Sequence, residues 1–205
     1  MRFSTYRDME CSQLFKEHGI VQVKDLTIEN ISHIFSTHIE YINGPSKFIG
    51  DEHFAIIYLD QSKSYFEQRY DFFHELSHVL KHTGDQRYLP ESFVKLQEEQ
   101  ANWYTLYFSM PRHIFEPEVM KNQSIDYLVD QFEIPEKFVR RRFELIQNER
   151  NRQEFQYKMQ QEEKNRRKKS LKSSEDLYDS TKQMLQQLSK QVGEEKLNYE
   201  IKRLL

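Results

Sequence analysis

Aromatic residues are distributed unevenly along this chain of 205 residues, which limits where a hydrophobic core can form. Of the 28 aromatic residues, 24 precede residue 151, and the other four are scattered through residues 151–205. A segment with so few large apolar side chains cannot bury a core of its own. We therefore predict one compact domain within the first 150 residues and a separate C-terminal unit after it.

The distribution of charge follows the same division. Residues 151–205 contain 13 Lys and Arg against 9 Asp and Glu, whereas the first 150 residues contain 17 against 24. The basic run at 164–172 has the composition of a segment that contacts nucleic acid or an acidic partner, but a solvated helix face is the simpler interpretation. The apolar seam between residues 177 and 205 is too short to predict a coiled coil.

Composition excludes several classes of protein. The chain contains only five Gly and five Pro, below the averages of roughly 7% and 5%, which favours a mostly helical fold. No run of apolar residues is long enough for a transmembrane helix, and no apolar stretch follows the N-terminus as in a secretory signal. The single cysteine, Cys11, excludes an internal disulfide. We therefore expect a cytoplasmic protein without a membrane anchor.

Hydrophobic periodicity and turn residues predict an α+β fold that is mostly helical and contains a small three-stranded sheet. Thr27 is a predicted N-cap, and Ser64 with Glu67 has the form of a capping box. The strand order cannot be read from the sequence, so the sheet is expected to be antiparallel or mixed. The expected helices span 6–18, 28–37, 65–83, 91–110, 124–132 and 135–149, and the expected strands 38–42, 47–49 and 54–59.

The strongest candidate for a reactive site is the segment His74-Glu75-Leu76-Ser77-His78. Two histidines four residues apart lie on one face of a helix, about 6 Å apart along its axis. Both can reach one zinc ion at the usual Zn–N distance of roughly 2.0–2.1 Å. Glu75 is offset around the helix, where it can take a proton from an attacking water and return it to the leaving amine. We therefore predict a metal-hydrolytic site.

A catalytic zinc usually takes three protein ligands. His82 lies about 12 Å along the helix axis from His74, too far for both to share one ion with His78. Glu98 and Glu99 on the next helix are the better candidates. Glu98 shares its face with small side chains that permit close approach of the helices, whereas Glu99 points about 100° away. Spacing favours Glu98 as the third ligand and leaves Glu99 open.

The motifs resemble those of the ImmA/IrrE metallopeptidases. Residues 71–82 have the sequence Asp-Phe-Phe-His-Glu-Leu-Ser-His-Val-Leu-Lys-His. The next helix contains Glu98-Glu99-Gln-Ala-Asn-Trp-Tyr and closes in Met110-Pro111. The resemblance implies a zincin-like core in which Glu75 is catalytic and the metal ligands are His74, His78 and Glu98. Ser77 stands where Gly or Cys is usual, and Thr105 stands where Ala is usual and is expected to crowd the helix contact.

The resemblance extends over about residues 14–146 and includes a helix–turn–helix-like segment at 127–142. With the compositional division, it gives three parts. These are a metallopeptidase core at 1–111, a helix–turn–helix-like segment at 112–150 and a charged helical tail at 151–205. Members of the family are cytoplasmic, and many are encoded on prophages and mobile elements. They cleave a helix–turn–helix repressor and so relieve repression.

The implied function is therefore that of an anti-repressor: a metalloendopeptidase that cuts an Xre-type repressor at one site. Zinc is the expected cofactor, with manganese as the alternative. One competing hypothesis is a protein that sequesters the repressor without cutting it. Another is a DNA-binding regulator that uses the helix pair at 124–149 and Arg140-Arg141-Arg142. We do not expect direct DNA binding, because the surrounding domain is acidic.

Two roles are left open by the sequence. No residue can be singled out to stabilise the oxyanion, although Tyr88, Tyr104 and Tyr107 are nearby in sequence. Residues that orient the metal ligands are also undetermined. The candidates for that role are Asp71, His82 and Asn102.

Overall fold

The computed structural model describes residues 6–50, 54–82, 89–169, 177–202 and 204–205. The chain divides into two compact units, Met1–Asn151 and Arg152–Leu205, and each is described by itself. Among the described helices, none combines the length and hydropathy needed to cross a membrane. The predicted three-part division, with its first boundary after residue 111, stays a prediction.

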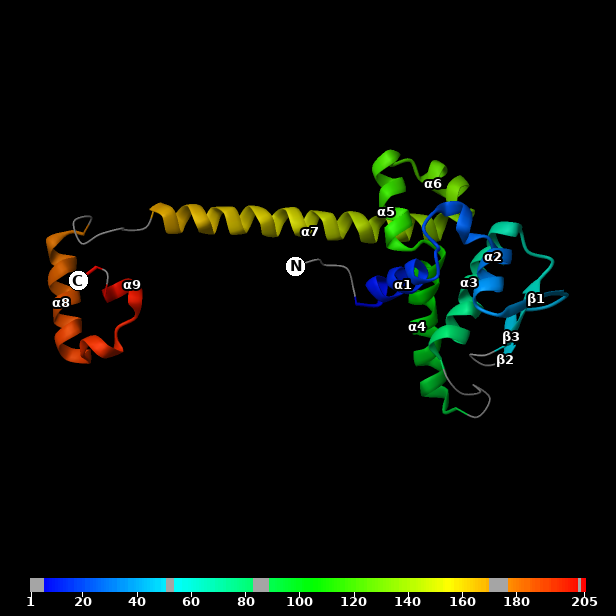
Figure 1. Cartoon of the computed structure of the whole chain (residues 1–205), viewed down its shortest axis with the longest axis horizontal. Coiled ribbons are helices and arrows are strands. Elements are labelled where there is room, and N and C mark those ends of the chain that lie inside the picture. The colour runs from blue at the N-terminus through cyan, green and yellow to red at the C-terminus, as the bar shows by residue number, and fades with distance from the viewer. Residues whose placement is uncertain (1–5, 51–53, 83–88, 170–176, 203) are drawn as a thin grey trace. The chain divides into compact units, whose positions relative to one another are not determined.

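The fold is α+β and mostly helical, with one three-stranded sheet, as the sequence predicts (Figure 1). The elements up to the sheet are α1 (Tyr6–Glu17), the 3-10 helix η1 (Val23–Leu26), α2 (Ile28–Ile34), β1 (Thr37–Ile42), β2 (Lys47–Gly50) and β3 (Ala55–Asp60). After it come α3 (Tyr65–Lys81), α4 (Glu91–Ser109), α5 (Arg112–Lys121), α6 (Ile125–Phe132) and α7 (Glu136–Lys169). The second unit also contains α8 (Asp179–Val192), the 3-10 helix η4 (Glu194–Lys196) and α9 (Tyr199–Lys202).

Side-chain caps start two helices where the sequence predicts them. The Thr27 hydroxyl accepts a hydrogen bond from the Asn30 backbone at 3.3 Å and begins α2. Ser64 and Glu67 form a complete capping box at the start of α3. The expected end of that helix, at residue 83, lies outside the described residues. Within them α3 ends at Lys81, and the backbone N–H of His82 caps it by donating to the carbonyl of His78.

The sheet is mixed and has the order β1-β3-β2. β3 runs parallel to β1 and antiparallel to β2, so that Phe48 lies opposite Ile57. One face of β3 carries the fully buried residues Ala55, Ile57 and Leu59, which face the helices. In the part of the chain that the structure describes, β2 pairs with β3 alone, which places β2 at an edge beside α3.

The helix pair α6–α7 packs on the same hydrophobic core as the elements around the sheet. Tyr70 of α3 stacks on Phe138 of α7. Arg142 of α7 is 1% exposed and donates to the carboxylate of Asp8 in α1, which is equally buried, at 2.6 Å. It also donates to the backbone carbonyl of Met110 at 3.0 Å. The first part of α7 is therefore held to the core by packing and by a buried ion pair.

Candidate metal centre

Helices α3 and α4 bring three side chains together at one point. The Nε2 atoms of His74 and His78 are 3.3 Å apart. The two carboxylate oxygens of Glu98 lie 3.4 Å from these nitrogens, one oxygen facing each ring. Among the described residues, these three form the group whose ligand atoms converge closely enough to hold a metal ion.

The spacing of this group fits a tetrahedral zinc ion. Bond lengths of roughly 2.0–2.1 Å at tetrahedral angles require ligand atoms about 3.3–3.4 Å apart. The two Nε2 atoms are 3.3 Å apart, which matches that requirement, and each of them has one oxygen of Glu98 at 3.4 Å. Two imidazoles and one carboxylate are also the donor set of many catalytic zinc sites, with the fourth position left for water or substrate. His74, His78 and Glu98 can therefore hold the metal that the sequence predicts.

The local fold explains why these side chains converge. His74 and His78 are one turn apart on α3, whose opposite side buries Phe72, Phe73 and Leu76 in the core. Glu98 is presented by α4, the helix with the most extensive packing against α3. Glu98 keeps 43% of its side-chain surface exposed and His74 keeps 20%, so the centre is open to solvent on one side.

Ser77 and Thr105, the two residues that depart from the family pattern, both fit into the contact between α3 and α4 without opening it to solvent. Ser77 is fully buried, and its hydroxyl donates to the carbonyl of His74 at 2.7 Å. Thr105 is also fully buried, and its hydroxyl donates to the carbonyl of Ala101 at 2.7 Å. The Thr105 hydroxyl oxygen lies 3.3 Å from Nδ1 of His74. The expected crowding by Thr105 is therefore accommodated, because its hydroxyl is hydrogen-bonded within the contact.

His78 is enclosed more completely than His74. It is 3% exposed, and the ring of Phe48 in β2 stacks on it with the centroids 5.8 Å apart. On the other side its Nδ1 lies 2.9 Å from Nδ1 of His82. Burial lowers the pKa of His78 to about 4, so the ring is neutral at physiological pH. His82 is outside the metal-binding group and contacts a candidate ligand instead, as the spacing along the helix predicts.

Glu75 lies beside this group in a buried position. It is 8% exposed and accepts a hydrogen bond from the backbone N–H of Phe48. Burial, reinforced by the negative charges of Glu98 and Asp71, raises the pKa of Glu75 to about 7. A carboxyl group with a pKa near the operating pH is well matched to accepting and returning a proton.

The burial of Glu75 predicts a pH-dependent stability of the metal-free protein. An unfolded Glu75 loses its proton near pH 4.5, whereas the folded one keeps it to about pH 7. The folded state therefore binds more protons in this window, and the contribution of Glu75 to stability is lost as the pH rises from 4.5 through 7. His78 acts in the opposite direction, because its pKa is lowered.

Comparison with Glu75→Gln isolates the effect of the carboxyl group. We expect the stability of this variant relative to wild type to increase between pH 4.5 and 7 and then to level off. Urea unfolding of both metal-free proteins across this range measures the difference. A difference that does not change with pH would show that Glu75 ionises normally in the folded protein.

The remaining candidates lie away from the converging atoms. Glu99 is exposed and is not part of the metal-binding group. Asp71 accepts hydrogen bonds from Ser46 and Lys63, each at 2.6 Å, and Asn102 donates to the backbone carbonyl of Glu98. Among the tyrosines considered for the oxyanion, Tyr104 packs near Arg7 and Lys81, Tyr107 packs under Arg142, and Tyr88 lies outside the described residues.

Phe48 is a neighbour of the site that the sequence does not identify. Its ring covers His78 and its backbone N–H reaches Glu75. Both contacts depend on the position of β2 at the edge of the sheet, and no residue pattern specifies that strand order. The signal that was available, a short strand expected at 47–49, predicts the strand without its place in the sheet.

The three consecutive arginines of α7 all have partners within the protein. Arg140 forms an ion pair with Glu136, and the guanidinium of Arg141 lies 4.5 Å from the ring centre of Trp103. Arg142 is buried against Asp8. Arg141 and Arg142 thus hold the helix pair to the core, whereas Arg140 pairs within α7 and stays exposed. Two of the three arginines are therefore poorly suited to phosphate contacts.

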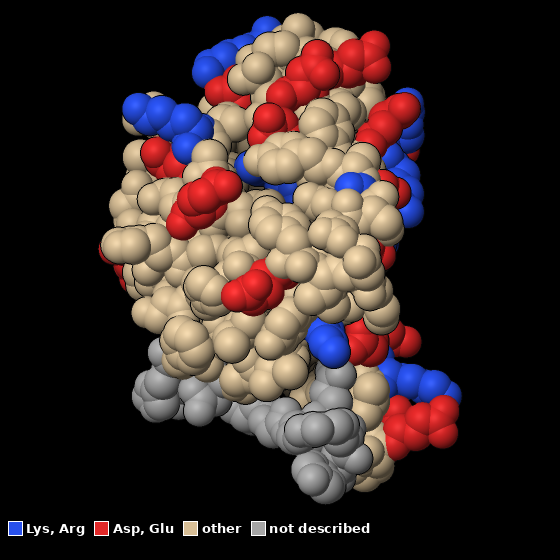
Figure 2. All heavy atoms as spheres, turned by 90° about the vertical axis from the view of Figure 1, so that its right-hand side faces the viewer, with Lys and Arg blue, Asp and Glu red and all other residues tan. Residues whose placement is uncertain are grey.

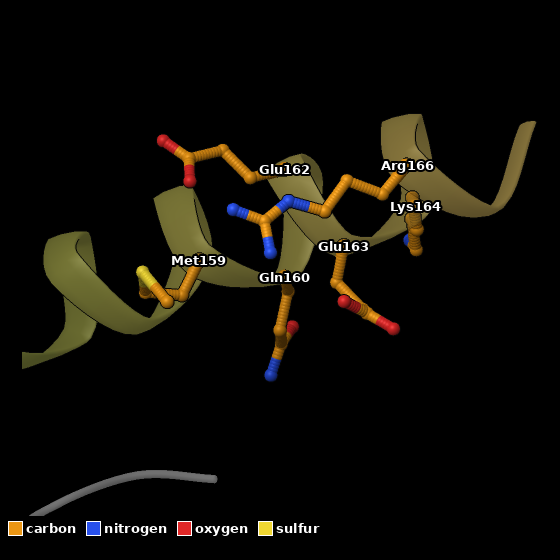
Figure 3. Close-up of a pocket in the computed structure, with 6 residues that line it drawn as sticks. All are labelled: Met159, Gln160, Glu162, Glu163, Lys164 and Arg166. Carbon is orange, nitrogen blue, oxygen red and sulfur yellow. The ribbon is translucent and has the colours of Figure 1, made fainter. Parts of the chain in front are cut away.

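Two cavities elsewhere carry no comparable chemistry. A hollow of about 500 Å³ on α7 is lined by residues of that helix, and their side chains project in several directions without converging (Figure 3). A second hollow, of about 420 Å³, lies between α1, α4 and α7. It is lined by Tyr6, Arg7, Trp103, Tyr107, Arg142, Leu145 and Glu149.

A helix with the His-Glu-x-x-His motif beside a small sheet, with a third ligand on the following helix, is the arrangement of a metallopeptidase. Comparison with known families agrees. Residues 25–144 match a peptidase family described as the IrrE N-terminal-like domain. The match covers more than half of the sequence, and the chain belongs to this family.

Two relatives come from Bacillus subtilis (strain 168). The chain is 26% identical over 136 residues to the uncharacterized protein YqaB, covering 64% of this chain and 78% of that protein. It is 32% identical over 106 residues to the phage-like element PBSX protein XkdA, covering 50% of this chain and 54% of that protein. The chain thus spans only about half the length of the second relative.

Proposed function

We propose that this protein is a zinc-dependent endopeptidase that cleaves a helix–turn–helix repressor at one site and so relieves repression. The observation that carries the proposal is the convergence of His74, His78 and Glu98 on one point, with Glu75 buried beside them. Binding of a metal alone would not require Glu75. A carboxyl group held in this position, with its pKa raised to about 7, supports catalysis rather than a purely structural metal site.

The proposed mechanism assigns the proton transfers to Glu75. When bound, zinc supplies Lewis acidity that activates water and polarises a peptide carbonyl. Glu75 accepts a proton from the attacking water and later donates it to the leaving amine. The N–H of Phe48 stabilises the ionised form of Glu75, whereas burial favours the protonated form. These opposing effects suit a group that must both accept and donate a proton.

The position of β2 at the edge of the sheet favours a substrate that binds in an extended conformation. Its outer edge lies next to Glu75, because the Phe48 N–H points at that carboxyl group rather than at β3. A peptide that pairs with an exposed strand edge is held by main-chain hydrogen bonds. The side of the first unit that bears the sheet has few charged side chains over its centre (Figure 2). Exposed apolar residues of this region are Tyr41, Ile49 and Phe54.

A repressor substrate is supported by the source of one relative, which is a protein of a phage-like element. The packing of Arg141 and Arg142 against the core favours a helix pair that builds the peptidase over one that reads DNA. The single cysteine is buried and unpaired, which is compatible with the reducing cytoplasm where a repressor would be met.

The proposal is tested by incubating the full chain with a helix–turn–helix repressor encoded beside its gene. The intact mass of the repressor is measured after incubation with zinc-loaded protein and with chelator-treated protein. We expect two discrete fragments whose masses sum to that of the repressor plus one water, and only in the zinc-loaded sample. A repressor that binds but stays intact would overturn cleavage and establish sequestration instead.

A further inference from the structure

We propose that Thr105 is a positioning residue whose hydroxyl group holds the imidazole of His74 in the tautomer that leaves Nε2 free to bind a metal. This inference rests on the proposed metal centre. Thr105 lies on α4, is fully buried in the contact with α3, and approaches the ring nitrogen of His74 that faces away from Glu98.

The first step is to locate the hydroxyl proton of Thr105. A threonine hydroxyl has one proton to donate and two lone pairs to accept with. Its oxygen is 2.7 Å from the carbonyl oxygen of Ala101 but 3.3 Å from Nδ1 of His74. A carbonyl oxygen can only accept, and back-bonding to the carbonyl four residues earlier is the usual geometry for threonine in a helix. The proton therefore goes to Ala101, and Thr105 presents a lone pair to His74.

The second step fixes the tautomer of His74. A neutral imidazole carries its proton on one of its two nitrogens. An acceptor facing Nδ1 places the proton there and leaves Nε2 with the lone pair that a metal requires. Nε2 of His74 is the atom that lies 3.3 Å from His78 and 3.4 Å from Glu98.

The Thr105 hydroxyl opposes the other tautomer of His74, in which Nε2 carries the proton. Without an acceptor at Nδ1, the carboxylate of Glu98 is the strongest acceptor near His74, and it faces Nε2. It would draw the proton to Nε2, which blocks that atom for metal binding. Thr105 thus opposes the influence of Glu98 in the metal-free protein and lowers the cost of loading the site.

The test compares three variants of the full chain. Thr105→Val removes the hydroxyl and nearly preserves shape, and Thr105→Ser restores a hydroxyl. Ser109→Ala is the matched control. Ser109 is also fully buried on α4, and its hydroxyl donates to the backbone carbonyl of Thr105, four residues earlier, at 2.7 Å. Zinc affinity is measured by competition with a chromophoric chelator. The tautomer of His74 is read in the metal-free proteins from long-range ¹H–¹⁵N correlations of the ring.

We expect Thr105→Val to weaken zinc binding by about 10–100-fold, the range typical of partners that orient metal ligands. The His74 signal should shift toward the Nε2-protonated form in this variant. Thr105→Ser and Ser109→Ala should retain the wild-type tautomer and affinity. An unchanged tautomer in Thr105→Val, or an equal loss of affinity in Ser109→Ala, would overturn the inference. If the wild-type protein binds no zinc, the metal centre itself fails, and the ring spectra still decide the role of Thr105.

Discussion

Glu75→Gln is expected to bind zinc as the wild-type protein does and to hydrolyse the repressor about 10²–10⁴-fold more slowly, the usual contribution of a general acid–base group. The amide has nearly the shape of the carboxyl group but cannot accept the proton of the attacking water. It can still accept the hydrogen bond from the Phe48 backbone. The measurement is the rate of fragment formation, followed by mass spectrometry at equal zinc occupancy.

The same substitution carries its own control against misfolding. Removing a buried ionisable group should stabilise the metal-free protein above pH 7, so activity falls while stability rises. A protein damaged by the substitution would lose both. Wild-type cleavage rates in Glu75→Gln would contradict the assignment of Glu75 as the proton-transferring group.

Glu98→Ala is expected to lower zinc affinity by more than about a hundredfold, beyond the range for residues that only orient ligands. It removes one of three ligands and leaves the two histidines without the carboxylate that faces both rings. Glu99→Ala is the matched control, since Glu99 is the next residue on the same helix but is exposed and outside the group. It should bind zinc as wild type does.

Chelator competition on the two variants decides between the glutamates. The assignment fails if Glu99→Ala releases zinc while Glu98→Ala retains it. Because each variant exchanges one glutamate for alanine on the same helix, their effects on helix propensity and net charge are matched. A difference in zinc affinity between them therefore reports on metal coordination.

The parts of the fold that depend on local signals were predictable from the sequence. Caps at Thr27 and Ser64 begin helices where their side chains can accept backbone N–H groups. The grouping of His74 with His78 follows from one turn of helix. The preference for Glu98 over Glu99 follows from the face that the small residues of α4 define.

The remaining features depend on tertiary contacts or run against local signals. Strand order is set by packing, so the position of Phe48 over His78 could not be read. Helix α5 contains Pro117, a residue that argues against a helix interior, and the sequence pattern did not predict this helix. The tail after residue 150 was predicted to be helical, but its polar sequence does not indicate that α7 continues without a break to Lys169.

The buried pair of Arg142 and Asp8 bears on how proteins of this kind can diversify. It joins residues 134 positions apart, and Arg142 also donates to the backbone carbonyl of Met110, where α4 ends. A foreign α7 without this arginine would remove the two hydrogen bonds that Arg142 donates to the buried Asp8 and would leave Arg112, at 3.6 Å, as a more distant partner. Exchange of the helix pair between relatives is therefore expected to cost stability, because breaking a buried ion pair is destabilising. Helices α1, α4 and the first part of α7 thus form one framework, in which a change to any one of the three must suit the other two.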